Sequence, residues 1–392
     1  MKVLKFGGTS VANAQNIKLV LEIINQNSKQ DKLVVVVSAL SKVTDLLQLA
    51  AAKAAANDES FREIVAEIEK KHLDTLKDLI PAYQQIDKDV VYKDSRELIK
   101  TNNNFSKAVV NFEVSNQLIQ EYFGENQSQI NILPGFIAQT HDGITTTLGR
   151  GGSDYTAAII AGALNASQLE IWTDVNGMFT ANPKIVKQAQ PIANISYQEA
   201  MELSHFGAKV LYPPTIQPVL RKNIPILIKN TFEPEAVGTL ISNQASSKDT
   251  VVKGISHIDH ISLVTLEGPG MIGVSGSSKR LFEVLSQEKI NVIFITQASS
   301  EHSICIGILN SDADNAEAAI NKAFEVEILQ NKIDPAIVEK DLCIIALVGE
   351  NMKNHQGLSG RMFSTLGKNN VNIRAIAQGA SERNISTTLK KH

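Results

Sequence analysis

The segment Lys5-Phe6-Gly7-Gly8-Thr9-Ser10 decides the fold. Its first two residues end a short apolar run, Lys2 to Phe6, that predicts a strand. Its lysine supplies a fixed cation, its glycines supply backbone N–H groups without Cβ obstruction, and its two hydroxyl residues supply a helix N-cap. Such groups stabilise oligophosphate charge. The lysine precedes the glycines, whereas in a P-loop it follows them, so we predict a phosphate site of another class. A plain glycine-rich turn is the alternative.

The composition is typical of a folded protein with two or three domains. The chain has 392 residues, 43% of them hydrophobic, and a formal net charge of −3. It has no basic block, which argues against nucleic acid or a membrane as a partner. Cys305 and Cys343 lie in apolar runs, which favours reduced thiols. No apolar run approaches the roughly 20 residues of a membrane span, and no leader precedes the first strand, so we expect a cytoplasmic protein.

The first part of the chain, up to about residue 243, alternates apolar runs with amphipathic stretches. This alternation predicts an α/β architecture, in which helices cover both faces of a largely parallel sheet. A charged, mostly helical lobe is expected between about residues 45 and 125, and a linker over Asn243 to Asp249. The clearest predicted strands are the apolar runs at residues 33–38, 130–139, 169–173 and 224–230.

The C-terminal part of the sequence repeats itself. Shifted by 81 residues, 276–304 matches 357–385 at 11 of 29 positions. Each copy is predicted to run strand, helix, strand, strand, and the first continues into a helix from about residue 314 to 324, which suggests a ferredoxin-like unit. By the same offset His392 corresponds to Ser311, so we expect the second copy to be C-terminally incomplete.

A second glycine-rich segment, Gly149-Arg150-Gly151-Gly152-Ser153-Asp154, precedes a predicted helix from Tyr155 to Leu164. The glycines permit close backbone approach, the helix N-terminus adds partial positive charge, and Arg150 offers a fork suited to a carboxylate. Asp154 either orients a cation such as Lys5 or serves as the helix's own first-turn carboxylate. The segment therefore predicts another anion site.

A turn after the apolar run 169–173 carries residues suited to a nucleotide base and ribose. Phe179 is placed to lie against a base and Lys184 to reach a phosphate. Lys209 is either a further phosphate ligand or a solvated surface charge. The histidines and cysteines show no metal-ligand spacing, and Ser153 has no histidine at a motif spacing. The predicted chemistry is therefore electrostatic phosphoryl transfer assisted by Mg²⁺.

In order and spacing, these motifs resemble aspartate kinase along essentially the whole chain. The resemblance rests on Lys5 to Ala12, Gly149 to Asp154, the Thr173-Asp174 turn and Phe206 to Leu211. It implies a three-layer αβα amino-acid-kinase domain followed by two ACT regulatory units. The expected boundaries are a kinase domain at 1–243, a linker and a strand pairing with the second ACT unit at 244–257, a first ACT unit at 258–335 and an incomplete second one at 336–392.

The resemblance implies transfer of the γ-phosphoryl group of MgATP to the β-carboxylate of L-aspartate. The product is 4-phospho-L-aspartate, the first step toward lysine, threonine and methionine. Lys5 would stabilise the transferring group, the Gly7 and Gly8 amides would hold phosphate oxygens, and Asp154 would orient Lys5.

The same resemblance assigns the residues that bind the two substrates. Arg150 would hold the α-carboxylate of aspartate and Glu113 its α-ammonium, with Thr44 and Ser38 as further contacts. The ATP-contacting positions would be Lys5, Gly8, Thr9, Ser10, Gly151, Gly152, Ser153, Thr173, Asp174, Phe179, Lys184 and Lys209.

Three positions depart from the family's pattern. Phe179 stands where the family has a tyrosine, Asn182-Pro183-Lys184 where it has Asp-Pro-Arg, and Phe112 where it has the glycine before the glutamate. A hydroxyl contact is thereby lost, and a bidentate guanidinium is replaced by a point charge. ATP affinity is where we expect the consequence.

The regulatory part indicates a subfamily. The segment Gln297 to Cys305 resembles the ACT segment of bifunctional aspartate kinase–homoserine dehydrogenases, which implies threonine rather than lysine as effector and a homodimer or larger homo-oligomer formed through the ACT units. Three alternatives stay open. In the first, the chain is the kinase half of such a bifunctional enzyme. In the second, it is another amino-acid kinase, which acts on a carboxylate, carbamate or nucleoside monophosphate. In the third, it is a weakly active amino-acid sensor.

Overall fold

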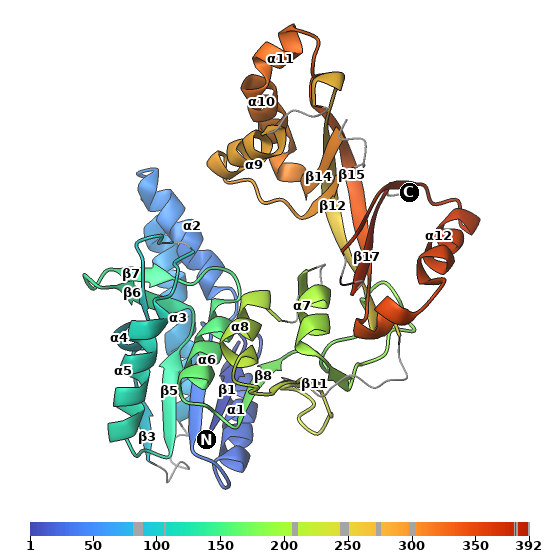
Figure 1. The fold of residues 1–392 in the computed structure, drawn as a ribbon. Helices are drawn as coiled ribbons and strands as arrows, with labels where there is room; N and C mark the ends of the chain where they lie inside the picture. The colour runs from blue at the N-terminus through green and yellow to red at the C-terminus, as the bar shows by residue number, and fades with distance from the viewer. Residues whose placement is uncertain are drawn as a thin grey trace. The chain divides into compact units, whose positions relative to one another are not determined.

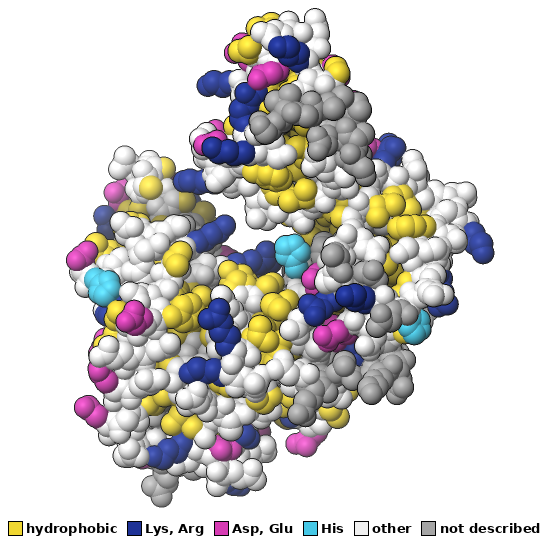
Figure 2. Space-filling view, viewed as in Figure 1, with side chains coloured by type: hydrophobic (Ala, Val, Ile, Leu, Met, Phe, Trp, Pro, Cys, Tyr) yellow, Lys and Arg dark blue, Asp and Glu magenta, His cyan; other side chains and the backbone are white. Residues whose placement is uncertain are grey.

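The structure is a computed structural model that describes residues 1–80, 89–105, 107–205, 211–243, 251–271, 276–297, 303–379, 381 and 383–390 (Figure 1). These residues form two compact units, the first largely within residues 1–243 and the second largely within 251–390. On the face drawn in Figure 2, basic and acidic side chains are interspersed over the first unit. None of the described helices has the length and hydropathy of a membrane span.

The first unit is built on an eight-stranded sheet of order β3-β5-β2-β1-β8-β10-β11-β9. Only β10 and β11 pair in antiparallel fashion among its neighbouring strands. The strands are β1 (Lys2–Phe6), β2 (Leu33–Val37), β3 (Val90–Tyr92), β5 (Ile130–Pro134), β8 (Gln168–Thr173), β9 (Asn194–Ile195), β10 (Ile226–Asn230) and β11 (Thr239–Ile241). The apolar sequence of β2 fits burial on both faces of a parallel sheet. The predicted α/β class is confirmed.

Helices cover both faces of this sheet. On one face, α1 (Ala14–Asn27) packs its apolar side chains against Leu4, Phe6 and Trp172. Since side chains alternate along a strand, Lys5 points to the other face, where α6 (Gly152–Ala163) lies against β1, β2 and β8. Next to α6 lie α5 (Phe112–Glu125) and α8 (Ile216–Leu220). The layers therefore bring the start of α6 to the Lys5 side of the sheet.

The predicted helical lobe is present, with short strands added to it. It contains the hairpin of α2 (Val43–Ala55) and α3 (Phe61–Leu79), and the short helix α4 (Ser95–Leu98). The strand β4 (Lys100–Thr101) belongs to a separate three-stranded sheet with β6 (Ile137–Thr140) and β7 (Thr145–Thr147). Another helix, α7 (Tyr197–His205), lies farther along the chain.

The single strand predicted at residues 130–139 is wrong. The structure divides it into β5 and β6, which belong to different sheets. The break is at Phe136, whose φ of 77° lies in the left-handed region. A tertiary contact accompanies this break, since the N–H of Phe136 donates to the hydroxyl of Thr156 in α6 at 3.0 Å.

The helix cap predicted at Thr9 and Ser10 is also wrong. The first helix starts at Ala14 and is capped by Asn13, whose side-chain oxygen accepts the N–H of Asn16 at 3.0 Å. Ser10 is fully buried, and its hydroxyl lies 2.7 Å from the hydroxyl of Thr231. Because this hydroxyl is taken by a tertiary contact, it does not cap the helix, and a loop separates strand from helix.

The second unit is built on a six-stranded antiparallel sheet of order β13-β14-β12-β15-β17-β16. The predicted repeat is confirmed, because α9 (Ser277–Gln287) and β14 (Ser303–Leu309) recur 81 residues later as α12 (Leu358–Lys368) and β17 (Asn384–Lys390). The other elements are β12 (Gly254–Glu267), β13 (Phe294–Gln297), α10 (Ala313–Ala323), α11 (Glu325–Leu329), β15 (Ile337–Val348) and β16 (Ile373–Gln378).

The two copies of the repeat share the long central strands β12 and β15. Residues 254–258 of β12 pair with residues 344–348 of β15, and residues 261–267 pair with β14 of the first copy. The pairing with β15 shifts register between these two parts. His260 and Asp341, which are equivalent in the repeat, have positive φ angles of 59° and 62° there. Residues 254–258 thus extend the sheet of the second copy, whereas the linker predicted over Asn243 to Asp249 lies outside the described residues except for Asn243.

Each face of this sheet carries its own apolar core. Leu281, Leu285, Ile320 and Phe324 of the first copy's helices pack on one face. The opposite face is lined by apolar residues of both copies, namely Ile261, Leu263, Phe294, Leu342, Ile344 and Ala346. Both cysteines are free thiols, and burial raises the pKa of Cys305. The second copy is packed less deeply, since no residue of α12 is fully buried.

The cap of α1 gives a test of the corrected helix start. We expect Asn13→Ala to lower the free energy of unfolding of the first unit by about 1 kcal/mol, because one first-turn N–H loses its acceptor. Chemical denaturation followed by circular dichroism measures this loss. Gln15→Ala, at an exposed position of the same turn, is the control and should change stability by less than half as much. Equal effects would contradict the assigned cap.

Candidate active site

The centre of the site is an ion pair between β1 and α6. The Lys5 ammonium lies 2.5 Å from Asp154 Oδ1, and the two side chains are 10% and 11% exposed. The contact is close enough for an ion pair, although its angle is outside the range of a directed hydrogen bond. The structure shows both features that the sequence leaves open for Asp154, because the residue contacts Lys5 and lies in the first turn of α6.

The loop after β1 offers a row of backbone donors. Among the described residues, the N–H groups of Gly8, Thr9 and Ser10 donate no backbone hydrogen bond. A Cβ atom on Gly8 would stand 3.2 Å from the carbonyl oxygen of Ala39, so the residue there has to be small. One on Gly7 would stand 3.5 Å from Lys5 Nζ, which places the ammonium beside the loop. Cation and N–H groups together make an anion site.

One of the expected donors is already engaged. The Gly7 N–H, assigned to phosphate oxygens by the resemblance, donates to the carbonyl of Trp172 at 3.0 Å, and the Ser10 hydroxyl donates to the same carbonyl at 3.4 Å. We therefore correct the assignment, because these groups fasten the loop to the end of β8. The free donors of the loop are the N–H groups of residues 8–10.

The second glycine-rich segment leads into α6 and packs closely against Tyr212. Gly151 caps the helix with φ of 69°, and a Cβ there would stand 2.3 Å from Cβ of Tyr212, so only glycine fits without displacement. The N–H groups of Ser153 and Asp154 have no backbone acceptor among the described residues. Arg150 is exposed, and the described residues include no ion-pair partner for it. This helix start is thus open to an anion.

The residues predicted to hold an amino-acid substrate lie at the edges of this region. Ser38 follows β2, and its N–H donates to the Phe6 carbonyl at 3.1 Å, beside the phosphate loop. Thr44 is exposed in the first turn of α2, and Glu113 is exposed in the first turn of α5, which packs against α6. Glu113 therefore lies on a helix that packs against α6, and Arg150 lies in the loop that leads into α6.

The predicted nucleotide positions after β8 form a separate turn. The hydroxyl of Thr173, at the end of β8, donates to the side chain of Asp174 at 3.2 Å. Phe179 is half-buried and pairs with Pro191 through a single bridge, whereas Lys184 is exposed. Lys209 lies outside the described residues.

One contact at the site escapes sequence reasoning. Lys71, half-buried in α3, donates a hydrogen bond to the carbonyl of Ser41. Ser41 lies against the phosphate loop, since its Cα would stand 3.9 Å from a Cβ on Gly8. The next residue, Lys42, precedes α2 as its N-cap residue and has a left-handed φ of 68°. No sequence signal marks Lys71, because it is one of many charged residues on an amphipathic helix.

The groups around Lys5 and the start of α6 fit a nucleoside triphosphate. A buried ammonium, free loop N–H groups and an open helix start provide the positive field that phosphates require. The described residues contain no group of three or more His, Cys, Asp or Glu side chains placed to hold a metal. Mg²⁺ is commonly bound through substrate phosphates and one or two carboxylates.

Comparison with protein families decides the class. The amino acid kinase family matches residues 1–230, and the ACT domain matches residues 264–324 and 345–392. Aspartokinase 2 of Bacillus subtilis is 33% identical over 400 residues, covering 100% of this chain and 94% of that protein. The chain belongs to the amino acid kinase family, in its aspartokinase branch.

Other relatives of this aspartokinase-family chain are longer. Bifunctional aspartokinase/homoserine dehydrogenase 2 of Arabidopsis thaliana is 35% identical over 448 residues, covering 99% of this chain and 49% of that protein. The chain thus spans about half the length of the bifunctional relatives. Among solved structures, E. coli aspartokinase III in complex with aspartate and ADP has a TM-score of 0.81 and 27% identity, covering 100% of this chain and 96% of that one.

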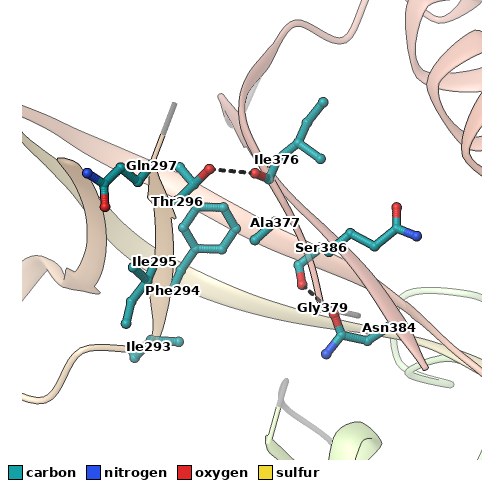
Figure 3. A pocket seen from close by; sticks show the side chains of 11 residues that line it. Ile293, Phe294, Ile295, Thr296, Gln297, Ile376, Ala377, Gly379, Asn384 and Ser386 are labelled. Atoms are coloured by element: carbon teal, nitrogen blue, oxygen red, sulfur yellow. Dashed lines mark hydrogen bonds between the residues drawn. The ribbon is translucent and has the colours of Figure 1, made fainter. Parts of the chain in front are cut away.

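The second unit of this aspartokinase-family chain contains a cleft where the two edge strands meet. The Thr296 hydroxyl of β13 donates to the Ile376 carbonyl of β16 at 2.8 Å (Figure 3). The cleft beside this contact has a volume of about 470 Å³. Gln297 and Gln378, equivalent in the repeat, both line it, as do Asn384 and Ser386. The repeat therefore brings two equivalent amides to one cleft.

A buried carboxylate supports the loop anchor on β8. Glu170 is 4% exposed, accepts the indole N–H of Trp172 at 2.9 Å and lies 3.9 Å from the Lys2 ammonium. Burial raises the pKa of Glu170, and the nearby Lys2 charge only partly offsets this. The native state therefore binds this proton more tightly than the unfolded state does. The stability that protonated Glu170 contributes is fully present below the ordinary pKa of 4.5, and it is lost as the pH rises through the raised pKa.

Glu170→Gln tests this pH dependence. The variant keeps an acceptor for the indole N–H and removes the buried charge, so we expect its stability to gain on that of the parent as the pH rises above 4.5, and the gain to level off above the raised pKa. Denaturation midpoints between pH 4 and 8 measure it. The exposed residue Glu22 provides the control, Glu22→Gln. Parallel pH curves for Glu170→Gln and the parent would contradict the buried charge.

Proposed function

We propose that the chain catalyses ATP-dependent phosphorylation of the β-carboxylate of L-aspartate to 4-phospho-L-aspartate, the first step toward lysine, threonine and methionine. The observation that carries the proposal is the buried Lys5–Asp154 pair beside two loops of free N–H groups. The similar E. coli enzyme binds aspartate and ADP in its solved structure. The division into a kinase domain, a linker and two ACT units is part of this proposal.

The proposed reaction is a direct displacement. An oxygen of the aspartate β-carboxylate forms a bond to the γ-phosphorus while the bond from that phosphorus to the β,γ-bridging oxygen breaks, and ADP leaves. No proton has to move. Positioning and charge stabilisation are therefore what the protein contributes.

The chain's own residues take these roles. Asp154 holds the Lys5 ammonium in a largely water-excluded place, where its charge acts strongly on the oxygens of the transferring group. The N–H groups of residues 8–10 and the start of α6 hold phosphate oxygens. Arg150 takes the α-carboxylate, Glu113 takes the α-ammonium, and Thr44 and Ser38 complete the substrate contacts. ATP would supply the phosphoryl group, and the Mg²⁺ bound to it would offset part of the phosphate charge.

The remaining predicted positions form the nucleotide side of the proposal. Thr173 ends β8, next to the residue whose carbonyl anchors the phosphate loop, and Asp174, Phe179 and Lys184 come after it in the sequence. With phenylalanine and lysine in place of the family's tyrosine and arginine, we expect weaker ATP binding.

Lys5→Ala tests the central role. Turnover should fall by about 10²- to 10³-fold or more, because the charge on the transferring group loses its cation. An aspartate-dependent assay of ADP release measures it, and melting temperature and threonine binding show that the fold survives. Lys18→Ala, at an exposed position of α1, is the control.

The same assay separates the rival functions. Retained activity in Lys5→Ala would refute the role of Lys5. Absence of aspartate-dependent turnover in the parent, with threonine still bound, would favour an amino-acid sensor. Glutamate turned over as well as aspartate would refute the substrate assignment.

We also propose feedback regulation by threonine at the cleft between β13 and β16, with homo-oligomers formed through the ACT units. In support, the cleft is lined by three side-chain amides and two hydroxyl residues, which suits the ammonium, carboxylate and hydroxyl of a small amino acid. We expect Gln297→Ala and Gln378→Ala each to weaken threonine inhibition by about tenfold, since one good hydrogen bond to a charged group is worth roughly 1.5 kcal/mol. Inhibition curves with threonine and with lysine measure this. Unchanged curves in both variants, or stronger inhibition by lysine, would contradict the proposal.

A further inference from the structure

Three aromatic side chains form a continuous ladder beside the α6 N-terminus. The rings of Phe112 and Tyr155 lie 6.4 Å apart at 73°, and those of Tyr155 and Tyr212 lie 6.4 Å apart at 79°. Both are edge-to-face contacts, which aromatic quadrupoles favour. The three residues come from α5, from α6 and from the turn before Pro213. We call Phe112, Tyr155 and Tyr212 the aromatic ladder.

Each end of the ladder lies close to one of the two residues proposed to hold the α-amino acid end of the substrate. Phe112 precedes Glu113 in the first turn of α5. Tyr212 packs on Gly151, which follows Arg150, so closely that a Cβ on Gly151 would stand 2.3 Å from Cβ of Tyr212. The ladder therefore joins the backbone at Glu113 to the backbone at Arg150 through three rings.

We propose that the aromatic ladder fixes the backbones at Glu113 and Arg150 relative to the start of α6, where Tyr155 follows Asp154, and thereby sets how far the bound amino dicarboxylic acid reaches toward Lys5. The inference rests on the proposed function, in which these two residues hold the α-amino acid end of the substrate. Both side chains are exposed and have several rotatable bonds, so their spacing depends on the backbone that carries them. Rigid rings with two rotatable bonds hold that backbone at low entropy cost.

The chemistry of the ladder identifies the ring, rather than the hydroxyl, as the working part of Tyr155. Burial and the neighbouring Tyr212 raise the pKa of Tyr155, so this phenol stays neutral. Its hydroxyl makes no hydrogen bond to another described residue. Tyr155→Phe therefore keeps the ladder intact, and Tyr155→Ala removes its middle ring.

The expected effect is a split between the two substrates. With the α-amino acid end misplaced, the β-carboxylate no longer meets the γ-phosphorus in line, while the phosphate loop is untouched. Phe112→Ala and Tyr155→Ala should raise the KM for aspartate by roughly tenfold or more, because Glu113 and Arg150 no longer hold it together, and should lower kcat through the misalignment. The KM for ATP should stay within twofold. The preference for aspartate over glutamate, one methylene apart, should fall by a similar factor.

The experiment measures kcat and KM for aspartate, glutamate and ATP in the full chain and in Phe112→Ala, Tyr155→Ala, Tyr155→Phe and Tyr212→Ala. Tyr155→Phe is the matched control and should resemble the parent. Phe112→Ala combined with Tyr212→Ala should raise the KM for aspartate by less than the product of the single effects, because either change alone already breaks the ladder. Melting temperatures are recorded for every variant.

Three outcomes would overturn the ladder. These are an unchanged KM for aspartate in Phe112→Ala and Tyr155→Ala with lower melting temperatures, equal increases in the KM for ATP, or a Tyr155→Phe variant as impaired as Tyr155→Ala. Calorimetric binding of aspartate separates this failure from that of the proposed function. A parent that binds aspartate without turning it over, with binding weakened in Phe112→Ala, would overturn the kinase assignment and uphold the ladder. A parent that does not bind aspartate would overturn both.

Discussion

The first unit depends on the pairing of one buried cation. Lys5 is 8% exposed, and an ammonium taken out of water is costly unless a counter-charge meets it. Asp154 supplies that charge from the first turn of α6. The N-terminus of α6 must therefore point toward the end of β1. The residues just before the helix must then be small enough to let neighbouring side chains pack there. Gly151 meets that demand, because its left-handed backbone and missing Cβ let Tyr212 pack against the helix start.

The sheet order explains why the anion sites gather at this point. β1 connects through α1 to β2 on one side, and its neighbour on the other side is β8. In parallel sheets, the crevice where neighbouring connections run in opposite directions is where ligands bind. Here the crevice is closed at its base by the hydrogen bond from the Gly7 N–H to the Trp172 carbonyl. Gly7 is used for this closure, and the next three N–H groups donate to no backbone acceptor in the part of the chain that the structure describes.

Much of this could be predicted from the sequence, because it rests on local pattern. The α/β class, the glycine-rich loops at strand ends and the repeat all follow from composition and spacing. What escaped prediction depends on contacts between distant residues. Phe136 divides a continuous apolar run because its backbone is bonded to Thr156. Ser10 fails to cap a helix because Thr231 takes its hydroxyl, and Lys71 reaches Ser41 across 30 positions.

The repeat in the second unit shows how duplication yields equivalence in sequence without equivalence in surroundings. His260 and Asp341 adopt the same left-handed backbone at the same place in each copy, so the strands bend alike and their edge strands meet. On the side of the first copy, however, α9 and α10 pack a buried core, whereas α12 buries no side chain fully. Gln297 therefore stands on a more rigid support than Gln378. A ligand that contacts Gln297 and Gln378 equally would then immobilise them at unequal entropic cost. The cost is higher at Gln378, because the less rigid side has more freedom to lose when a ligand binds.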